Sequence, residues 1–391
     1  MTTPARTDLL RPRHAHAHAR VTNIELFFDL VFVFAVTQLS HTLLAHLGVR
    51  TAVETALLFL AVWWVWIYTT WCTNWLDPDR SVVRLLMFVL MLLGLLLACS
   101  LPHAFDREGP LFVTCYVAMQ VGRTLFMVWA FGPAHPELRR NFQRVAVWLV
   151  LSAACWVAGT VWEGNVRLAL WALAVAIEYF SVAVGFWVPG LGQSSTRDWN
   201  IEGAHLAERC SLFIMIALGE SIVVMGTTAA AHPATWASVT AFAVAFIGSA
   251  AMWWIYFHRG YEKGTRQIES ADDPGRIGRL AYTYLHIPIV AGIIVGAVAD
   301  ELVLAHPEGH VDVPFIATTL GGTALFLLGN LGFKAVLWRR WPLSHLVGLG
   351  LLALAAFFAT AMSPLGLAAV AMVVLVVVAA WETLSLRGAV G

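Results

Sequence analysis

Two carboxylates lie four residues apart in an otherwise apolar run near the start of the sequence, ELFFDLVFVFAVTQLS at residues 25–40. A helix would place Glu25 and Asp29 on one face, because positions i and i+4 share a face. A charge at the centre of a membrane-spanning helix costs about 2.5–3.5 kcal/mol, so both side chains must face protein or water. Either Arg20 or Arg209 neutralises them and locks helices together, or they form a site for a cation or a proton.

A second apolar run contains three charged residues, AERCSLFIMIALGESIVVMG at residues 207–226. Glu208 and Arg209 stand near the start of this run, where they suit an ion-paired gate or a simple helix anchor. Glu220 lies about twelve residues beyond Glu208, about 18 Å away at 1.5 Å per residue, so it falls near or beyond the membrane midplane. Its side chain cannot extend to the interface from that depth. Glu220 therefore needs a partner within the protein.

Arg123 and Glu178 fall in the middle of other apolar runs, and His286 stands two residues before Pro288. We predict that Arg123 pairs with Glu220 or with Glu178, which leaves one carboxylate free to take a proton or a cation. The alternative is a wholly structural network of buried ions. His286 is either a satisfied core histidine or a proton relay. The candidate ion or substrate pathway comprises Glu25, Asp29, Arg123, Glu178, Glu208, Arg209, Glu220 and His286.

Motifs for catalysis and for cofactor binding are absent from the sequence. There is no phosphate-binding loop, HExxH motif or nucleophile elbow, and the five cysteines form no CxxC pair. We expect no catalytic residues, no resident metal and no cofactor. The acidic stretch ADELVLAHPEGHVDV at residues 299–313 is expected in an outer loop. There its carboxylates could attract cations or simply be solvated.

The composition places all these residues in a membrane protein. The 391 residues are 59% apolar and 12% charged, whereas soluble domains are about 45–50% apolar and about 25% charged. Basic and acidic residues number 24 each, which argues against nucleic acid as a partner. The expected partners are membrane lipids and a cation, a proton or a small solute, with a homo-oligomer left open.

Twelve apolar runs are long enough to cross a membrane, since a bilayer core of about 30 Å needs about 20 residues per helix. They predict an all-α polytopic membrane protein with about twelve transmembrane helices. Small residues at both ends of GIIVG, residues 292–296, predict a close helix contact. The expected spans are 22–47, 52–74, 82–102, 110–131, 142–161, 166–188, 204–227, 236–258, 278–302, 314–336, 342–360 and 364–384.

The distribution of lysine and arginine predicts the orientation, because cytoplasmic loops hold an excess of both. With the N-terminus inside, only Arg50, Arg107 and Arg167 fall in outer loops, and Arg123 and Arg209 fall within helices. All other basic residues, Lys334 included, lie on the inner side. We predict a multi-pass protein of the cell inner membrane with both termini in the cytoplasm.

Short segments recur in order along the chain, as expected after a duplication. AVWW at residues 61–64 recurs as AMWW at 251–254, and GRTLF at 122–126 recurs as GTALF at 322–326. Each half would hold six helices, so the two repeats would run parallel. The predicted organisation is a basic cytoplasmic tail (1–21), a first six-helix repeat (22–188), a cytoplasmic linker (189–203), a second six-helix repeat (204–384) and a cytoplasmic tail (385–391).

The segments VTNIELFFDLVFVFAVTQLSHTL, residues 21–43, and AERCSLFIMIALGESIVVMG, residues 207–226, resemble the bacterial low-temperature-requirement protein A family over nearly the whole chain. The resemblance implies an integral membrane protein. ELFFDLVFVFA is also similar to the Phe-Ser-Asp signature of potassium channels built from two six-helix repeats. Here Phe28 stands at the Ser position, and Leu212 follows Ser211 where the second signature has Asp.

Three kinds of function fit these residues. A transporter or ion pathway would use the intramembrane carboxylates around an axis between the repeats. A membrane-embedded or lipid-handling enzyme would need an acid and base at membrane depth, such as Glu220 with His286. A non-transporting scaffold for stress tolerance would keep every buried charge paired. The family's name describes a growth requirement that any of the three could produce.

Overall fold

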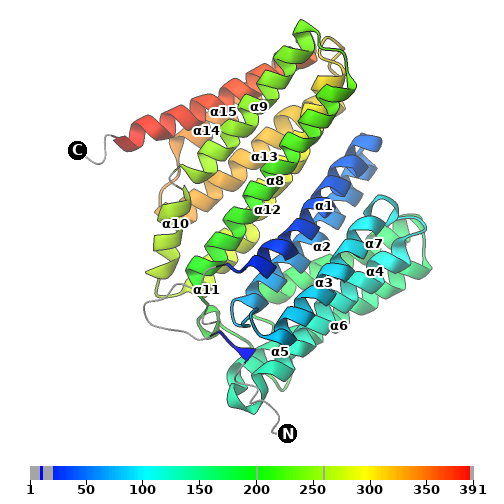
Figure 1. Cartoon of the computed structure of the whole chain (residues 1–391), viewed down its shortest axis with the longest axis vertical. Helices are drawn as coiled ribbons and strands as arrows, with labels where there is room; N and C mark the ends of the chain where they lie inside the picture. Colours follow the sequence, from blue (N-terminus) through cyan, green and yellow to red (C-terminus); the bar gives the residue numbers. More distant parts are fainter. Residues whose placement is uncertain (1–8, 12–20, 200, 259, 388–391) are drawn as a thin grey trace. The chain divides into compact units, whose positions relative to one another are not determined.

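The computed structural model of the chain describes residues 9–11, 21–199, 201–258 and 260–387. These ranges contain helices and no strand, and twelve of their helical segments are long and apolar enough to cross a membrane. The predicted all-α polytopic class with twelve spans is confirmed. Most of the predicted tails, 1–21 and 385–391, lie outside the described residues. The helices, labelled in Figure 1, are α1 (Asn23–Ala45), α2 (Val49–Thr73), α3 (Ser81–Ser100), α4 (Gly109–Val117), α5 (Arg123–Phe131), α6 (Pro136–Val161), α7 (Gly164–Ala183), α8 (Gly203–Ala231), α9 (Trp236–Phe257), α10 (Gly260–Glu269), α11 (Pro274–Ile277), α12 (His286–Ala305), α13 (Val313–Trp338), α14 (Leu343–Phe358) and α15 (Pro364–Arg387).

Several helix ends differ from the predicted ones for local reasons. α6 begins at Pro136, six residues before the predicted start. The prediction followed the apolar run alone, and the first turns of the helix are polar and precede that run. α7 ends at Ala183 because Gly185 and Phe186 adopt positive φ angles of 60° and 53°, which end a right-handed helix. α10 was not predicted, because it is polar and too short to span.

Two spans contain a turn of π-helix. The segment Ala118–Gly122 joins α4 to α5 directly before Arg123, and the segment Gly278–Tyr284 ends two residues before His286, the first residue of α12. Such turns are rare in proteins and occur often at functional sites.

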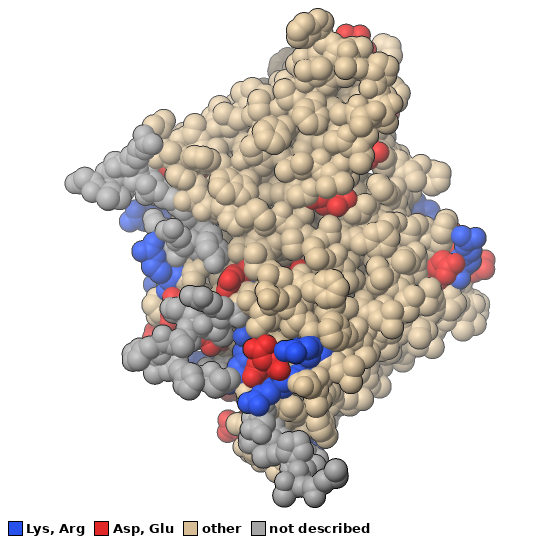
Figure 2. Space-filling model, viewed as in Figure 1, with Lys and Arg blue, Asp and Glu red and all other residues tan. Residues whose placement is uncertain are grey.

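The chain divides into two compact units, and each is described by itself. The first contains residues 1–42, 49–209 and 269–276, and the second contains residues 43–48, 210–268 and 277–391. The division falls within α1 and α8, so it does not coincide with the predicted repeats, which stay a prediction. Figure 2 shows a face on which most of the surface is uncharged, as expected of a protein surrounded by lipid.

The first unit has an aromatic core. α6 packs against α5 and α7, and α2 also packs against α7. Trp64 of α2 stacks on Tyr179 of α7 with ring centroids 3.9 Å apart, and Trp156 of α6 lies against Trp171 of α7 at 5.4 Å. These large rings fix the helices that hold the buried charges.

In the second unit, glycines bring α12 and α13 together. A Cβ atom on Gly292 would lie 2.4 Å from the backbone nitrogen of Phe326, and one on Gly322 would lie 2.9 Å from the nitrogen of Gly296. Only glycine permits backbones to approach this closely. The close helix contact predicted from GIIVG is therefore confirmed.

Candidate functional site

Glu25 and Asp29 lie on one face of α1, and both are completely buried. Arg209 of α8 bridges them within the first unit. Its Nη2 atom donates to Asp29 Oδ1 at 2.5 Å, and its Nη1 atom lies 3.2 Å from Glu25 Oε1. The guanidinium also lies over the rings of Phe28 and Trp66, with its central carbon 6.0 and 5.8 Å from their centroids. Of the two neutralising partners proposed from the sequence, Arg209 makes the contact, and Arg20 lies outside the described residues.

Glu25 has further partners on either side. His205, one helical turn before Arg209 in α8, places Nε2 2.8 Å from Glu25 Oε1. Arg11 donates from Nη2 to Glu25 Oε2 at 2.8 Å. Thr22 donates to the same oxygen from its backbone nitrogen and from its hydroxyl, both at 2.9 Å. This carboxylate therefore accepts donors from α8, from the start of α1 and from the segment around Arg11.

The position of Arg11 is fixed by the end of α2. Its Nε atom donates to the carbonyl oxygens of Thr73 at 2.8 Å and Leu76 at 3.0 Å. Asn74 donates to the Glu202 carbonyl at 2.9 Å and lies 3.3 Å from His205 Nδ1. The turn after α2 therefore positions both Arg11 and His205.

We call Arg11, Glu25, Asp29, Trp66, His205 and Arg209 the carboxylate cluster. Two carboxylates face two guanidinium groups, so the cluster is electrically balanced while His205 is neutral. Trp66 Nε1 donates to Asp29 Oδ1 at 2.8 Å. Nevertheless, Asp29 Oδ2 and Arg209 Nε are buried without a hydrogen-bond partner among the described residues. Buried polar atoms are normally satisfied, so the cluster can accept one more polar group.

Glu208 lies beside the cluster and is partly exposed. Its Oε2 atom accepts a hydrogen bond from the backbone nitrogen of Val21 at 3.3 Å. This contact joins the start of α8 to the start of α1, which agrees with the helix-anchor interpretation.

Glu178 of α7 forms a separate buried network in the first unit. Tyr116 donates to its Oε2 atom at 2.5 Å, and Ser152 and Trp156 donate to Oε1 at 2.7 and 3.0 Å. Gln120 of the π-helical turn adds a longer contact of 3.4 Å. Four neutral donors from three helical segments thus surround a single carboxylate, an arrangement that suits a structural role.

The prediction that Arg123 pairs directly with Glu178 is wrong. Arg123 donates from Nη2 to the Gln120 side-chain oxygen, and from Nη1 to Thr69 at 2.9 Å and to the Val65 carbonyl at 3.2 Å. Gln120 stands three residues before Arg123 and occupies the space between the two charges. The alternative partner, Glu220, belongs to the second unit, so that pairing stays a prediction.

In the second unit, His286 is buried and held by two hydrogen bonds. Its Nε2 atom lies 2.7 Å from the Tyr256 hydroxyl, and its Nδ1 atom lies 2.8 Å from the Ala281 carbonyl. These contacts agree with a satisfied core histidine. Glu220 is partly exposed and, within the second unit, has no hydrogen bond or ion pair with His286 or with another described residue.

Sequence reasoning missed several members of these networks. His205 could have been found, because it stands four residues before Arg209 and shares its helix face. Arg11 and Trp66 gave no signal, since only the fold brings them to the carboxylates.

Lys334, predicted from the sequence to lie on the inner side, is buried within α13. Its Nζ atom donates to Glu382 Oε2 of α15 at 2.7 Å.

The acidic stretch at residues 299–313 is not a single loop. Asp300 and Glu301 belong to α12, and Asp312 caps α13 by accepting a hydrogen bond from the Phe315 nitrogen at 2.8 Å. Because α12 continues to Ala305, the first two carboxylates lie within a span. Among the residues that the structure describes, no cluster of three or more histidine, cysteine or acidic side chains could hold a metal ion.

Comparisons with known proteins agree with this architecture. A family model described as "Bacterial low temperature requirement A protein" matches residues 20–380. A protein of Rhizobium meliloti (strain 1021), described as uncharacterized, is 40% identical over 363 residues, which cover 93% of this chain and 89% of that protein. No solved structure shows significant similarity to the chain.

Proposed function

The chain belongs to the bacterial low temperature requirement A family, and from this premise we propose that it is a transporter or ion pathway that uses intramembrane carboxylates. One observation carries the proposal: Asp29 and Arg209 form a completely buried ion pair in which Asp29 Oδ2 and Arg209 Nε lack a hydrogen-bond partner among the described residues. Charges within a span are costly and usually mark ion or substrate pathways when they persist.

The partly satisfied pair supports transport over a purely structural role. A structural ion pair needs additional hydrogen bonds to offset the cost of desolvation. Glu178 has such bonds on both oxygens, whereas Asp29 has them on one. A pair with unused donors and acceptors can bind a passing ion, proton or polar solute without first losing its own contacts.

The two other functions have weaker support. An enzyme using Glu220 and His286 would need the two side chains to meet, and His286 is instead bonded to Tyr256 and Ala281. A scaffold would have every buried charge satisfied, which describes Glu178 and not Asp29.

We also propose that the protein lies in the inner membrane and consists of two parallel six-helix repeats.

The test is flux into proteoliposomes across a panel of H⁺, Na⁺, K⁺ and small anions. Asp29→Asn keeps the size of the side chain and removes its charge, so we expect flux to fall at least about tenfold, the effect of about 1.4 kcal/mol. The matched control is Glu54→Gln, because Glu54 forms only an exposed pair with Arg50 at 2.8 Å. Thermal unfolding of each purified variant checks that the fold is retained.

Two results would contradict the proposal. One is the absence of flux above empty liposomes for every solute tested. The other is unchanged flux in a folded Asp29→Asn variant, which would make the pair structural.

A further inference from the structure

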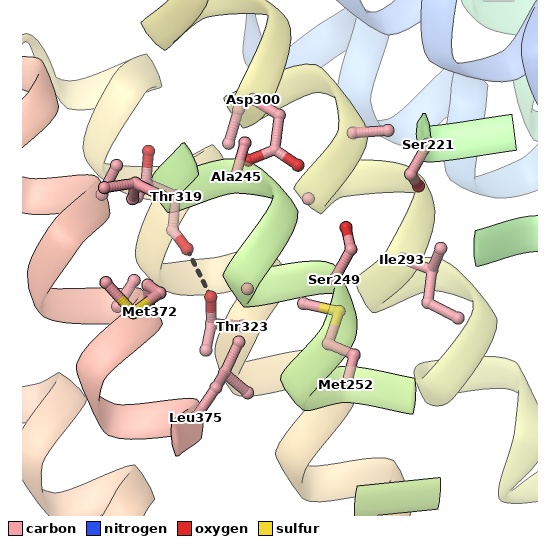
Figure 3. Close-up of a pocket in the computed structure, with 17 residues that line it drawn as sticks. Ser221, Ala245, Ser249, Met252, Ile293, Asp300, Thr319, Thr323, Met372 and Leu375 are labelled. Atoms are coloured by element: carbon pink, nitrogen blue, oxygen red, sulfur yellow. Dashed lines mark hydrogen bonds between the residues drawn. The ribbon is translucent and has the colours of Figure 1, made fainter. Parts of the chain in front are cut away.

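A cavity with five polar side chains in its lining lies in the second unit, separate from the carboxylate cluster. It has a volume of about 40 Å³ and is bounded by α8, α9, α12, α13 and α15. Small residues such as Gly248, Gly296 and Ala371 form much of its wall and leave the space open. Figure 3 shows the polar residues that line it, which are Ser221, Ser249, Asp300, Thr319 and Thr323.

Asp300 supplies a carboxylate that no described residue neutralises. It stands five residues before the end of α12, about 7–8 Å inside the helix at 1.5 Å per residue. No ion pair or hydrogen bond to its carboxylate occurs within the described ranges, and the cavity lining contains no lysine, arginine or histidine. A carboxylate within a span is costly unless it has a counter-charge.

Two hydroxyl groups in the cavity lining also have unused hydrogen-bonding capacity. Thr319 is 5% exposed, and its Oγ1 atom is buried without a hydrogen-bond partner in the described structure. Ser249 is 8% exposed and forms no hydrogen bond there. In Figure 3 the Ser249 hydroxyl is directed toward the part of the cavity where the Asp300 carboxylate lies. An unsatisfied buried hydroxyl and an unneutralised carboxylate in the lining of one cavity indicate a missing polar ligand.

The donor set defines the class of that ligand. Apart from the thioether sulfurs of Met252 and Met372, the side-chain donors are oxygens, which hard cations prefer over nitrogen or sulfur ligands. A single carboxylate balances one positive charge, whereas calcium sites take six to eight oxygens and usually several carboxylates. The volume of about 40 Å³ has room for about three water-sized particles, because one water needs about 10–15 Å³ by the same measure. It therefore suits a small ion with a few waters better than an organic solute.

We infer that this cavity binds one monovalent cation of about the size of Na⁺, with Asp300 as the charged ligand and the hydroxyl of Ser249 as a neutral ligand. The inference goes beyond the proposed function, because the cavity is a different site from the carboxylate cluster, and it rests on that function only for the ion's passage. Binding itself can be measured without any flux.

The experiment measures binding of radioactive Na⁺ to the purified full chain in detergent, at constant ionic strength maintained with choline chloride. We expect saturable binding at a single site. Asp300→Asn should weaken it at least about tenfold, because the only charged ligand is lost. Ser249→Ala should weaken it by a smaller factor, and this change is mild enough to preserve the fold.

Glu301→Gln is the matched control, because Glu301 is the next residue of α12 and does not line the cavity. It should bind Na⁺ as the unaltered protein does. Thermal unfolding provides a second readout, since a ligand that binds only the folded state raises its stability. Na⁺ should raise the unfolding temperature of the unaltered protein and of Glu301→Gln, but not of Asp300→Asn.

Several outcomes would overturn the inference. They are no Na⁺ binding beyond the choline background, equal binding by a folded Asp300→Asn variant, or binding of K⁺ in preference to Na⁺. The two proposals can also fail separately. Flux without Na⁺ binding would reject this site and retain the transport function, whereas Na⁺ binding without flux would retain the site and reject transport.

Discussion

At the scale of single residues, two buried carboxylates of the first unit have contrasting environments. Every described contact to Glu178 comes from a neutral donor, and both of its oxygens are occupied. Asp29 faces the charged Arg209 and has one oxygen without a partner in the described structure. The difference supports a structural role for Glu178 and, under the function that we propose, an exchange of partners at Asp29.

Replacing Glu178 with glutamine should therefore reduce stability. The new amide nitrogen would face Tyr116, Ser152 or Trp156 instead of accepting their hydrogen bonds, at a cost of about 1–3 kcal/mol. Thermal unfolding in detergent should show a lower midpoint. Glu163→Gln, at the exposed start of the same helix, is the control. Equal midpoints for the two variants would show that the network around Glu178 contributes little.

Sequence reasoning identified part of the carboxylate cluster. Glu25, Asp29 and Arg209 were recognisable, because a charge in an apolar run is conspicuous wherever the chain folds. Arg11 and Trp66 were not, because neither residue is unusual in its own segment and each reaches a carboxylate only through tertiary packing. The same limit explains the wrong pairing of Arg123 with Glu178, since neutral Gln120 could not be recognised as the partner of Arg123.

At the scale of elements, the twelve spans were predictable because hydropathy depends only on length and composition. The positions of helix ends and of the two π-helical turns were not predictable, since they depend on local backbone geometry. The contact between α12 and α13 was predictable from glycine spacing, although the partner helix was not.

Gly321 and Gly322 provide a direct test of that contact. A Cβ atom on Gly322 would meet the backbone of α12, whereas one on Gly321 would have no atom within 4 Å. Gly322→Ala should therefore destabilise the fold by about 1–3 kcal/mol. Gly321→Ala should be neutral or slightly stabilising, because alanine favours helix. Thermal unfolding of the two variants, side by side, gives the comparison. Similar effects at both positions would contradict the close approach of the two helices.

At the scale of the whole molecule, the proposed orientation makes a prediction about both ends. Twelve spans are an even number, so the two termini should lie on the same side of the membrane. The excess of lysine and arginine assigns that side to the cytoplasm. A reporter active only in the cytoplasm should function at either end, and a reporter active only outside should function at neither. Opposite results at the two ends would imply an odd number of spans.

The hydrogen bonds of Arg11 have a practical consequence for anyone who produces the protein. This residue precedes the first span, yet it supplies one of the two guanidinium groups that balance Glu25 and Asp29. An N-terminal truncation that removes residues 1–11 would remove the Arg11 guanidinium and leave one negative charge of the Glu25 and Asp29 pair unbalanced. Loss of function in such a shortened protein would then reflect an electrostatic defect inside the membrane, and N-terminal affinity tags are best placed before residue 1 with these residues intact.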